Sequence, residues 1–100
     1  MRLIHEAQGF NWDDGNSGKN WIKHGVTDTE CEEVFGNRPF AIVEDKKHSE
    51  EEEEERFCAF GKSDENRLLS IAFTIRNGMI RIITARPMSK NERKVYEETT

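Results

Sequence analysis

The sequence has few of the residues that mark secreted, membrane-spanning or metal-binding proteins. Its 100 residues include only two cysteines and two prolines. Cys31 and Cys58 form neither a Cys-x-x-Cys motif nor a spacing shared with histidine, so we expect buried thiols rather than a disulfide or a metal site. No apolar run approaches the roughly 20 residues of a membrane span, and no apolar segment of a signal peptide is visible. These absences predict a cytoplasmic protein that uses neither a metal nor a cofactor.

Charge is abundant but unevenly distributed. Charged residues make up 35% of the chain and hydrophobic residues 34%, which is enough for a core, and the length predicts one domain over residues 1–100. The formal net charge of −5 depends on the unbroken run Glu50 to Glu55. We expect this run to be a solvated loop and not a metal site, because neighbouring carboxylates repel one another. From Arg76 to Lys94 the chain is basic, with six arginines and lysines against the single acid Glu92.

The segment from Leu68 to Tyr96 predicts a β-hairpin followed by a helix. Asn77-Gly78 is typical of a two-residue type I′ turn, in which both residues take positive φ. If Arg76 and Met79 flank this turn, the register of the two strands follows. The predicted cross-strand pairs are Ile75 with Ile80, Thr74 with Arg81, Phe73 with Ile82, Ala72 with Ile83, and Ile71 with Thr84.

That register gives the hairpin two different faces. One face is large and apolar and is the candidate core face: Leu69, Ile71, Phe73, Ile75, Ile80 and Ile82. The other face is small and polar with two guanidinium groups, and we expect it to stay open for a ligand: Ser70, Ala72, Thr74, Arg76, Arg81, Ile83 and Ala85. The segment from Thr84 to Pro87 should leave the sheet, since proline has no N–H for a strand ladder.

The remaining segments complete an α+β pattern. Alternating or apolar runs predict short strands, and polar cap residues predict helices. The expected strands are Phe10–Asp13, Phe40–Val43 and Phe57–Phe60, with a charged loop from Asp45 to Glu55. The expected helices are Lys19–His24, ended by Gly25; one begun by the capping box of Thr27 and Glu30; and a C-terminal one begun by Ser89 and Glu92. We expect two layers, with an antiparallel sheet, both N-terminal helices on its apolar face, and the C-terminal helix.

A series of sequence marks, in this order, resembles the BrnT-type toxins of bacterial type II toxin-antitoxin pairs over most of the chain. The marks are Phe10-Asn11-Trp12-Asp13, the box Asn20 to Val26, Glu32 to Phe35, His48-Ser49, Glu55-Arg56-Phe57, Gly61-Lys62-Ser63, Ile80 to Arg86, and Glu92-Arg93 with Tyr96. The resemblance implies a RelE-like fold and a ribosome-independent endoribonuclease that inhibits translation and growth until a cognate BrnA-like antitoxin neutralises it. The resemblance therefore implies that RNA is the substrate and that DNA is contacted only through the antitoxin. It also implies that the complex forms a dimer or a heterotetramer.

Metal-free RNA cleavage needs a general acid or base and cations on the phosphate. His24 is the best acid or base, because its usual pKa of about 6.5 lets it serve in both roles. Arg81 and Arg86 are the best phosphate clamps, since guanidinium binds phosphate bidentately. Tyr96 is the fourth candidate catalytic residue, through a hydrogen bond to phosphate or stacking on a base. Further RNA contacts are expected from Lys23, Arg76, Lys90 and Arg93.

Three of these residues also have a purely structural explanation. His24 can stabilise the end of its helix through the helix dipole, Arg81 can cover an exposed sheet face with its stem, and Tyr96 can anchor the last helix. Two functions other than catalysis therefore stay open. One is a catalytically inactive module that binds the antitoxin, and the other is a small nucleic-acid-binding module.

Overall fold

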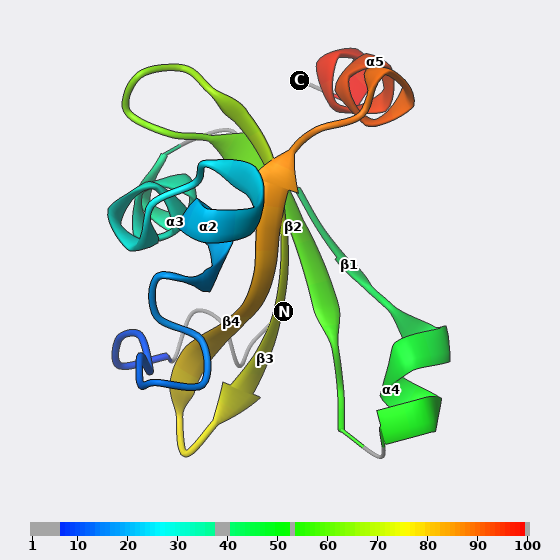
Figure 1. Cartoon of the computed structure of the whole chain (residues 1–100). Coiled ribbons are helices and arrows are strands. Elements are labelled where there is room, and N and C mark those ends of the chain that lie inside the picture. Colours follow the sequence, from blue (N-terminus) through cyan, green and yellow to red (C-terminus); the bar gives the residue numbers. More distant parts are fainter. Residues whose placement is uncertain (1–6, 38–40, 53, 100) are drawn as a thin grey trace.

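The computed structural model describes residues 7–37, 41–52 and 54–99 (Figure 1). The elements follow in the order α2 (Lys19–His24), α3 (Asp28–Gly36), β1 (Ala41–Glu44), α4 (Lys46–Glu52), β2 (Phe57–Lys62), β3 (Leu68–Arg76), β4 (Met79–Pro87) and α5 (Lys90–Thr99). The four strands form one antiparallel sheet in the order β1-β2-β3-β4. The predicted α+β class is therefore confirmed.

The β3–β4 hairpin turns at the predicted dipeptide. Asn77 has φ 53° and Gly78 has φ 76°, so both central residues take the left-handed conformation of a type I′ turn. The three predicted pairs nearest the turn are confirmed: Ile75 with Ile80, Thr74 with Arg81, and Phe73 with Ile82.

Beyond those pairs a β-bulge changes the register. Ala72 pairs with Thr84 and Ile71 with Ala85, so both predicted partners, Ile83 and Thr84, were wrong by one residue. A bulge places two residues of one strand opposite one residue of the other, and here Ile83 is the extra residue. The shift turns Ala85, expected on the open face, into the core, where it is 0% exposed.

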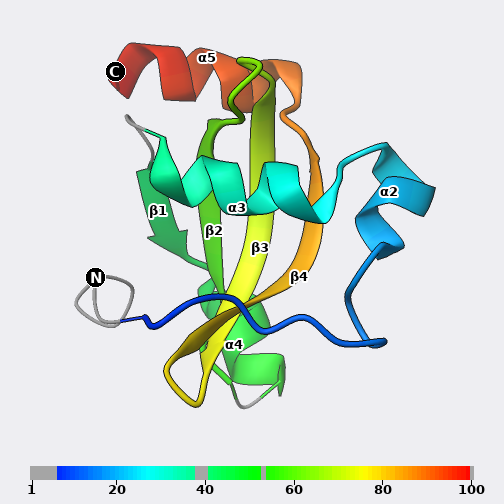
Figure 2. The same ribbon diagram turned by 90° about the vertical axis from the view of Figure 1, so that its left-hand side faces the viewer.

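The apolar face of the hairpin is the core face, as predicted. Helix α3 lies across it (Figure 2), and Cys31 and Val34 of that helix are fully buried. Phe73 lies at the centre, with its ring 5.1 Å from that of Phe35 and 5.5 Å from that of Phe57. The buried hairpin residues are Leu69, Ile71, Phe73, Ile80 and Ile82, and Ile75 packs against them partly buried.

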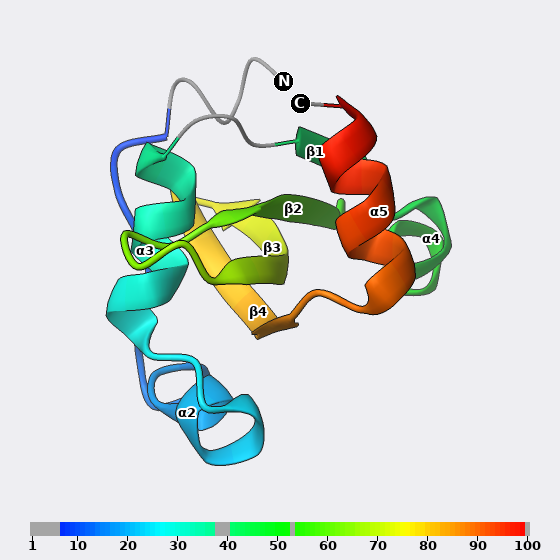
Figure 3. The same ribbon diagram turned by 90° about the horizontal axis from the view of Figure 1, so that it is seen from above.

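The two N-terminal helices do not share that face. Helix α2 has the predicted bounds and ends at Gly25 with φ 66°, but it lies beside the edge of the sheet at β4, while α3 covers the sheet (Figure 3). Asn20 fixes α2 there, because its Oδ1 accepts a hydrogen bond from the backbone N–H of Ala85 (2.9 Å). The bulge and the position of α2 are thus linked through one buried side chain.

Several element boundaries also differ from the predictions. The segment Phe10–Asp13 forms only one parallel bridge, between Phe10 and Ile80, instead of a strand. The expected charged loop Asp45–Glu55 contains α4. Strand β4 continues to Pro87, which ends it opposite Leu69. Phe40 lies outside the described residues, and β1 begins at Ala41. Both predicted capping boxes are present.

The second face of the sheet is only partly open. Helix α5 packs against its β1–β2 side, where Tyr96 is buried near Phe60. Thr74, expected to be open, is 1% exposed, and its hydroxyl donates to the carbonyl of Glu55 (2.7 Å). What remains accessible is the part near the hairpin turn. None of the described helices is long and apolar enough to cross a membrane.

Candidate RNA-binding pocket

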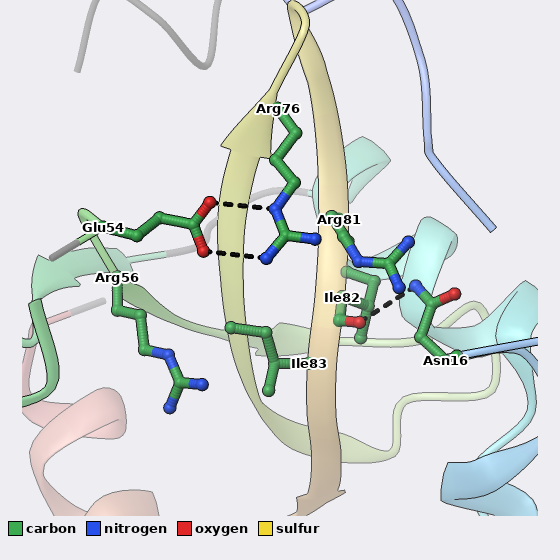
Figure 4. Close-up of a pocket in the computed structure, with 8 residues that line it drawn as sticks. Asn16, Glu54, Arg56, Arg76, Arg81, Ile82 and Ile83 are labelled. Atoms are coloured by element: carbon green, nitrogen blue, oxygen red, sulfur yellow. Dashed lines mark hydrogen bonds and ion pairs between the residues drawn. The ribbon is translucent and has the colours of Figure 1, made fainter. Parts of the chain in front are cut away.

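A pocket of about 540 Å³ opens on this remaining part of the second face (Figure 4). We call it the arginine pocket, because three guanidinium groups line it and, among the described residues, one carboxylate. Its lining residues are Gly15, Asn16, Glu54, Arg56, Arg76, Arg81, Ile82 and Ile83. They come from the loop before α2, the end of the glutamate run, and β3 and β4, so segments far apart in the sequence build it. Such a concentration of positive charge favours an anionic ligand.

Arg76, the last residue of β3, is held by Glu54. Its Nε donates to Oε2 of Glu54 at 2.9 Å and its Nη2 donates to Oε1 at 3.0 Å. The pKa of Glu54 is lowered, first by this hydrogen-bonded guanidinium. This fork is the geometry with which arginine binds a phosphate. A phosphate that binds Arg76 in this way must therefore replace the carboxylate.

Arg81 projects from β4 toward the N-terminal segment. Its two terminal nitrogens donate to the two carboxylate oxygens of Asp13, both at 3.0 Å, and Nη1 also donates to Oδ1 of Asn11. The hydrogen bond from Arg81 is the main reason that the pKa of Asp13 lies below its usual value. Gly15 lies so close that a Cβ on it would be 2.8 Å from Nη2 of Arg81. The bare backbone at Gly15 thus leaves room for the guanidinium.

Arg56 is the pocket residue that the sequence interpretation missed as a functional candidate. Its backbone N–H donates to the hydroxyl of Ser49 (2.7 Å), which fixes the chain just before β2. Its buried Nε has no hydrogen-bond partner within the part of the chain that the structure describes. A buried guanidinium N–H without an acceptor is costly, so this atom is a candidate donor to a bound anion. The alternation of side chains along a strand could have identified Arg56 in the sequence, because Phe57 faces the core and its neighbour therefore faces the opposite side.

The structure brings together only part of the predicted site. Arg76 and Arg81 line the arginine pocket, whereas Arg86 lies toward the far end of β4. Two nitrogens of Arg86 donate to the two carboxylate oxygens of Glu92 at 2.6 and 2.9 Å, which ties β4 to α5. The pKa of Glu92 is lowered to about 2, first by this guanidinium and then by hydrogen bonds from Ser89. Arg86 therefore has a structural partner on α5.

His24 and Lys23 are exposed at the C-terminal end of α2. The carbonyl of Gly25, which follows them, accepts a hydrogen bond from Arg67 at 2.8 Å. Arg67 directly precedes β3, so the end of α2 lies near the start of that strand, whereas Arg76 lies at the other end. His24 thus lies on the β4 side of the molecule but is not among the residues that line the arginine pocket.

The candidates on α5 form a third group. Tyr96 is 6% exposed and lines an apolar pocket of about 310 Å³ with Val43 and Phe60, and burial raises the pKa of its hydroxyl. Lys90 and Arg93 are exposed on the same helix. Among the residues described, no cluster of three or more histidine, cysteine, aspartate or glutamate side chains is arranged to hold a metal ion.

Comparison with known proteins identifies the family of this chain. The family described as "Ribonuclease toxin, BrnT, of type II toxin-antitoxin system" matches residues 12–92. The matched range includes Asp13, Arg56, Arg76 and Arg81, and it ends at Glu92, the partner of Arg86. A search of curated proteins returns no match. Because the family covers most of the chain, the protein belongs to the BrnT ribonuclease toxins of type II toxin-antitoxin systems.

Proposed function

We propose that this BrnT protein is a metal-independent endoribonuclease with a RelE-like fold, which cleaves RNA in the cytoplasm and so inhibits translation and growth. The observation that carries the proposal is the arginine pocket, where three guanidinium groups surround a space large enough for a phosphate. Guanidinium stays charged at physiological pH and can bind phosphate oxygens in pairs, so Arg56, Arg76 and Arg81 are suited to hold a backbone phosphate of the RNA.

In the proposed reaction the 2′-oxygen of a ribose attacks the neighbouring phosphorus. The O2′–P bond forms and the P–O5′ bond breaks, which leaves a 2′,3′-cyclic phosphate and a 5′-hydroxyl. A base removes the proton of the 2′-hydroxyl, and an acid returns one to the leaving oxygen. We assign this proton transfer to His24, with Lys23 assisting at α2. Because His24 lies outside the arginine pocket, the pocket arginines bind another phosphate of the same strand. Arg86, Lys90, Arg93 and Tyr96 then contact RNA farther along β4 and α5.

Purified protein and a labelled RNA test the mechanism. Cleavage should continue in EDTA and leave 2′,3′-cyclic phosphate ends. His24→Ala and Arg81→Ala should each lose on the order of 10²-fold in rate while remaining folded, because each removes a proton-transfer group or an electrostatic donor. Arg81→Lys should recover only part of the rate, since lysine lacks the fork. Lys47→Ala, which removes an exposed charge on α4, is the matched control. Loss of activity in EDTA and its return with magnesium would contradict the mechanism.

We also propose a cognate BrnA-like antitoxin as the protein partner, in a complex that is a dimer or a heterotetramer and contacts DNA only through the antitoxin. An acidic or helical partner would suit the basic segment from Arg76 to Tyr96 and would block RNA there. In a co-purified complex, amide hydrogen exchange should slow over residues 76–96. Protection confined to residues 50–55 would place the partner elsewhere.

A catalytically inactive module that binds the antitoxin or nucleic acid is the second candidate. It is favoured by the pairing of Arg76, Arg81 and Arg86 with carboxylates, and by the position of His24 outside the arginine pocket. Expression without a partner separates the two functions. A ribonuclease should stop colony formation, whereas unaltered growth at confirmed soluble expression supports the inactive module.

A further inference from the structure

Helix α2 exposes two large apolar side chains next to each other. Trp21 is 60% exposed and Ile22 is 83% exposed. Tryptophan usually buries most of its ring, so an exposed indole on an ordered helix needs an explanation. The helix is firmly attached, because Asn20, the residue before Trp21, is 3% exposed and bonded to Ala85. Trp21 is therefore exposed although its helix is firmly packed against the sheet.

The two tryptophans of the chain differ in their surroundings. The indole Nε1 of Trp12 donates to Glu32 at 2.7 Å, and its ring packs against the core. Within the described residues, no hydrogen bond engages the indole of Trp21, and this ring is not part of the core cluster. Trp21 is thus available to a ligand, and Trp12 is an internal reference for it.

The exposed charged side chains of α2 itself are cationic. Lys19, Lys23 and His24 are exposed on the same helix, and the helix contains no acidic residue. An aromatic ring among lysines is the combination that binds single-stranded nucleic acid, because the ring stacks on a base and the lysines contact phosphates. The exposed Ile22 would also suit an apolar protein partner, so the test below includes this alternative as an outcome.

The loop that enters α2 also lines the arginine pocket. Asn16 lines this pocket, and its amide donates to the carbonyl of Ile82 on β4 (3.0 Å). The first residue of α2 is Lys19, three positions later, and Asn20 holds the helix against the same strand. The chain therefore runs from the pocket beside β4 to α2, and Figure 2 shows this course of the chain. An RNA strand with a phosphate in the pocket can extend along it.

We infer that Trp21 is a stacking platform for an unpaired base of the RNA substrate, with Lys19 and Lys23 contacting its backbone. The inference rests on the proposed ribonuclease function and adds that the substrate is single-stranded beside the cleaved bond. Bases in a duplex are already stacked on their neighbours and cannot cover the indole. Stacking does not depend on hydrogen bonds to base edges, so α2 should add affinity with little sequence preference.

Binding of a single-stranded 2′-O-methyl oligoribonucleotide tests the inference, because this probe lacks the nucleophilic hydroxyl and is not cleaved. Trp21→Ala should weaken binding by about 5- to 150-fold, the range for loss of one stacked base. Trp21→Phe should keep most of the affinity, while Trp21→Leu should resemble Trp21→Ala, because leucine is apolar but cannot stack. Ile22→Ala is the matched control and should bind as the wild type does. Bound probe should quench the fluorescence of wild-type protein but not that of Trp21→Phe.

The outcomes separate this inference from the proposed function. If wild-type protein cleaves RNA and Trp21→Ala binds the probe as tightly as wild type, the platform is wrong and the ribonuclease stands. If Trp21→Ala and Ile22→Ala weaken only the complex with a co-expressed antitoxin, α2 is a protein interface and the inference is overturned. If wild-type protein neither binds the probe nor cleaves RNA, the proposed function fails together with the inference.

Discussion

Replacing Glu92 by glutamine tests whether Arg86 ties β4 to α5. Glu92 accepts two hydrogen bonds from Arg86, at 2.6 and 2.9 Å, and one from the backbone N–H of Ser89 at 2.9 Å. Glutamine removes the charge but keeps a side-chain oxygen, and it is accepted at this position of a capping box. The variant Glu92→Gln therefore weakens the ion pair while leaving the start of the helix intact.

The pKa of Glu92 sets the size and the pH range of the effect. Its fall from 4.5 to about 2 corresponds to a ceiling of about 3 kcal/mol, at about 1.4 kcal/mol per pKa unit. The side chain of Arg86 is 44% exposed, so solvent screening reduces this to about 1 kcal/mol. A carboxylate whose pKa is lowered by folding stabilises the protein above its unfolded pKa, and this contribution is lost as the pH falls toward the folded pKa. The loss should therefore occur between about pH 4.5 and 2.

Thermal unfolding of wild type and Glu92→Gln from pH 7 to pH 2 measures the contribution. At pH 7 the variant should melt about 4–8 °C lower, the shift that about 1 kcal/mol gives in a domain of this size. The two curves should converge as the pH approaches 2. Glu98→Gln, at an exposed position on the same helix, is the matched control and should not change the melting temperature. Equal melting temperatures at pH 7, or a difference that persists at pH 2, would refute the structural role of the pair.

Three further outcomes are expected. The variant Gly15→Ala should stay folded but cleave RNA up to about 10²-fold more slowly, because its Cβ would displace the tip of the Arg81 side chain. An unchanged rate of cleavage would argue against Arg81 as the phosphate clamp. Phe73→Ala should lower the free energy of unfolding by about 3–5 kcal/mol in urea titrations, since the central ring of the core leaves a cavity. Burial raises the pKa of Cys31 to about 12 and also raises that of Cys58. In the native protein at pH 8, a thiol reagent should therefore not react with Cys31 and should react slowly with Cys58. Rapid labelling before denaturation would contradict this.

Local chemistry made the hairpin turn and the helix starts predictable. The Asn77-Gly78 turn requires two residues with positive φ, and each capping box satisfies backbone N–H groups within four residues of chain. These local rules do not predict that each capping glutamate also binds an arginine. Glu30 accepts from Arg67 at 2.9 Å and Glu92 accepts from Arg86, so each box also ties its helix to the sheet. Those partners depend on tertiary packing.

The bulge and α4 were missed for different reasons. In the shifted register the backbone N–H of Ala85 donates to Asn20, 65 positions earlier, and the strand pattern does not reveal this contact. Helix α4 is composed largely of charged residues and lacks the apolar period by which helices are recognised. At the site, the basic segment predicted Arg76 and Arg81 correctly as neighbours in space. Arg56 was missed because it follows six glutamates, although its alternation with Phe57 indicates its side of the sheet.

The contacts of Arg81 also have a consequence for the order of folding. Asn11 and Asp13 reach this arginine across 70 and 68 positions of chain, and the backbone of Gln8 and Asn11 bonds to the hairpin at Gly78 and Ile80. Contacts between such distant positions form late, because the chain first loses the entropy of closing a long loop. The hairpin can fold locally, whereas the arginine pocket is complete only after the N-terminal segment has docked. The pocket on which the proposed function rests is thus the last part of this fold to form.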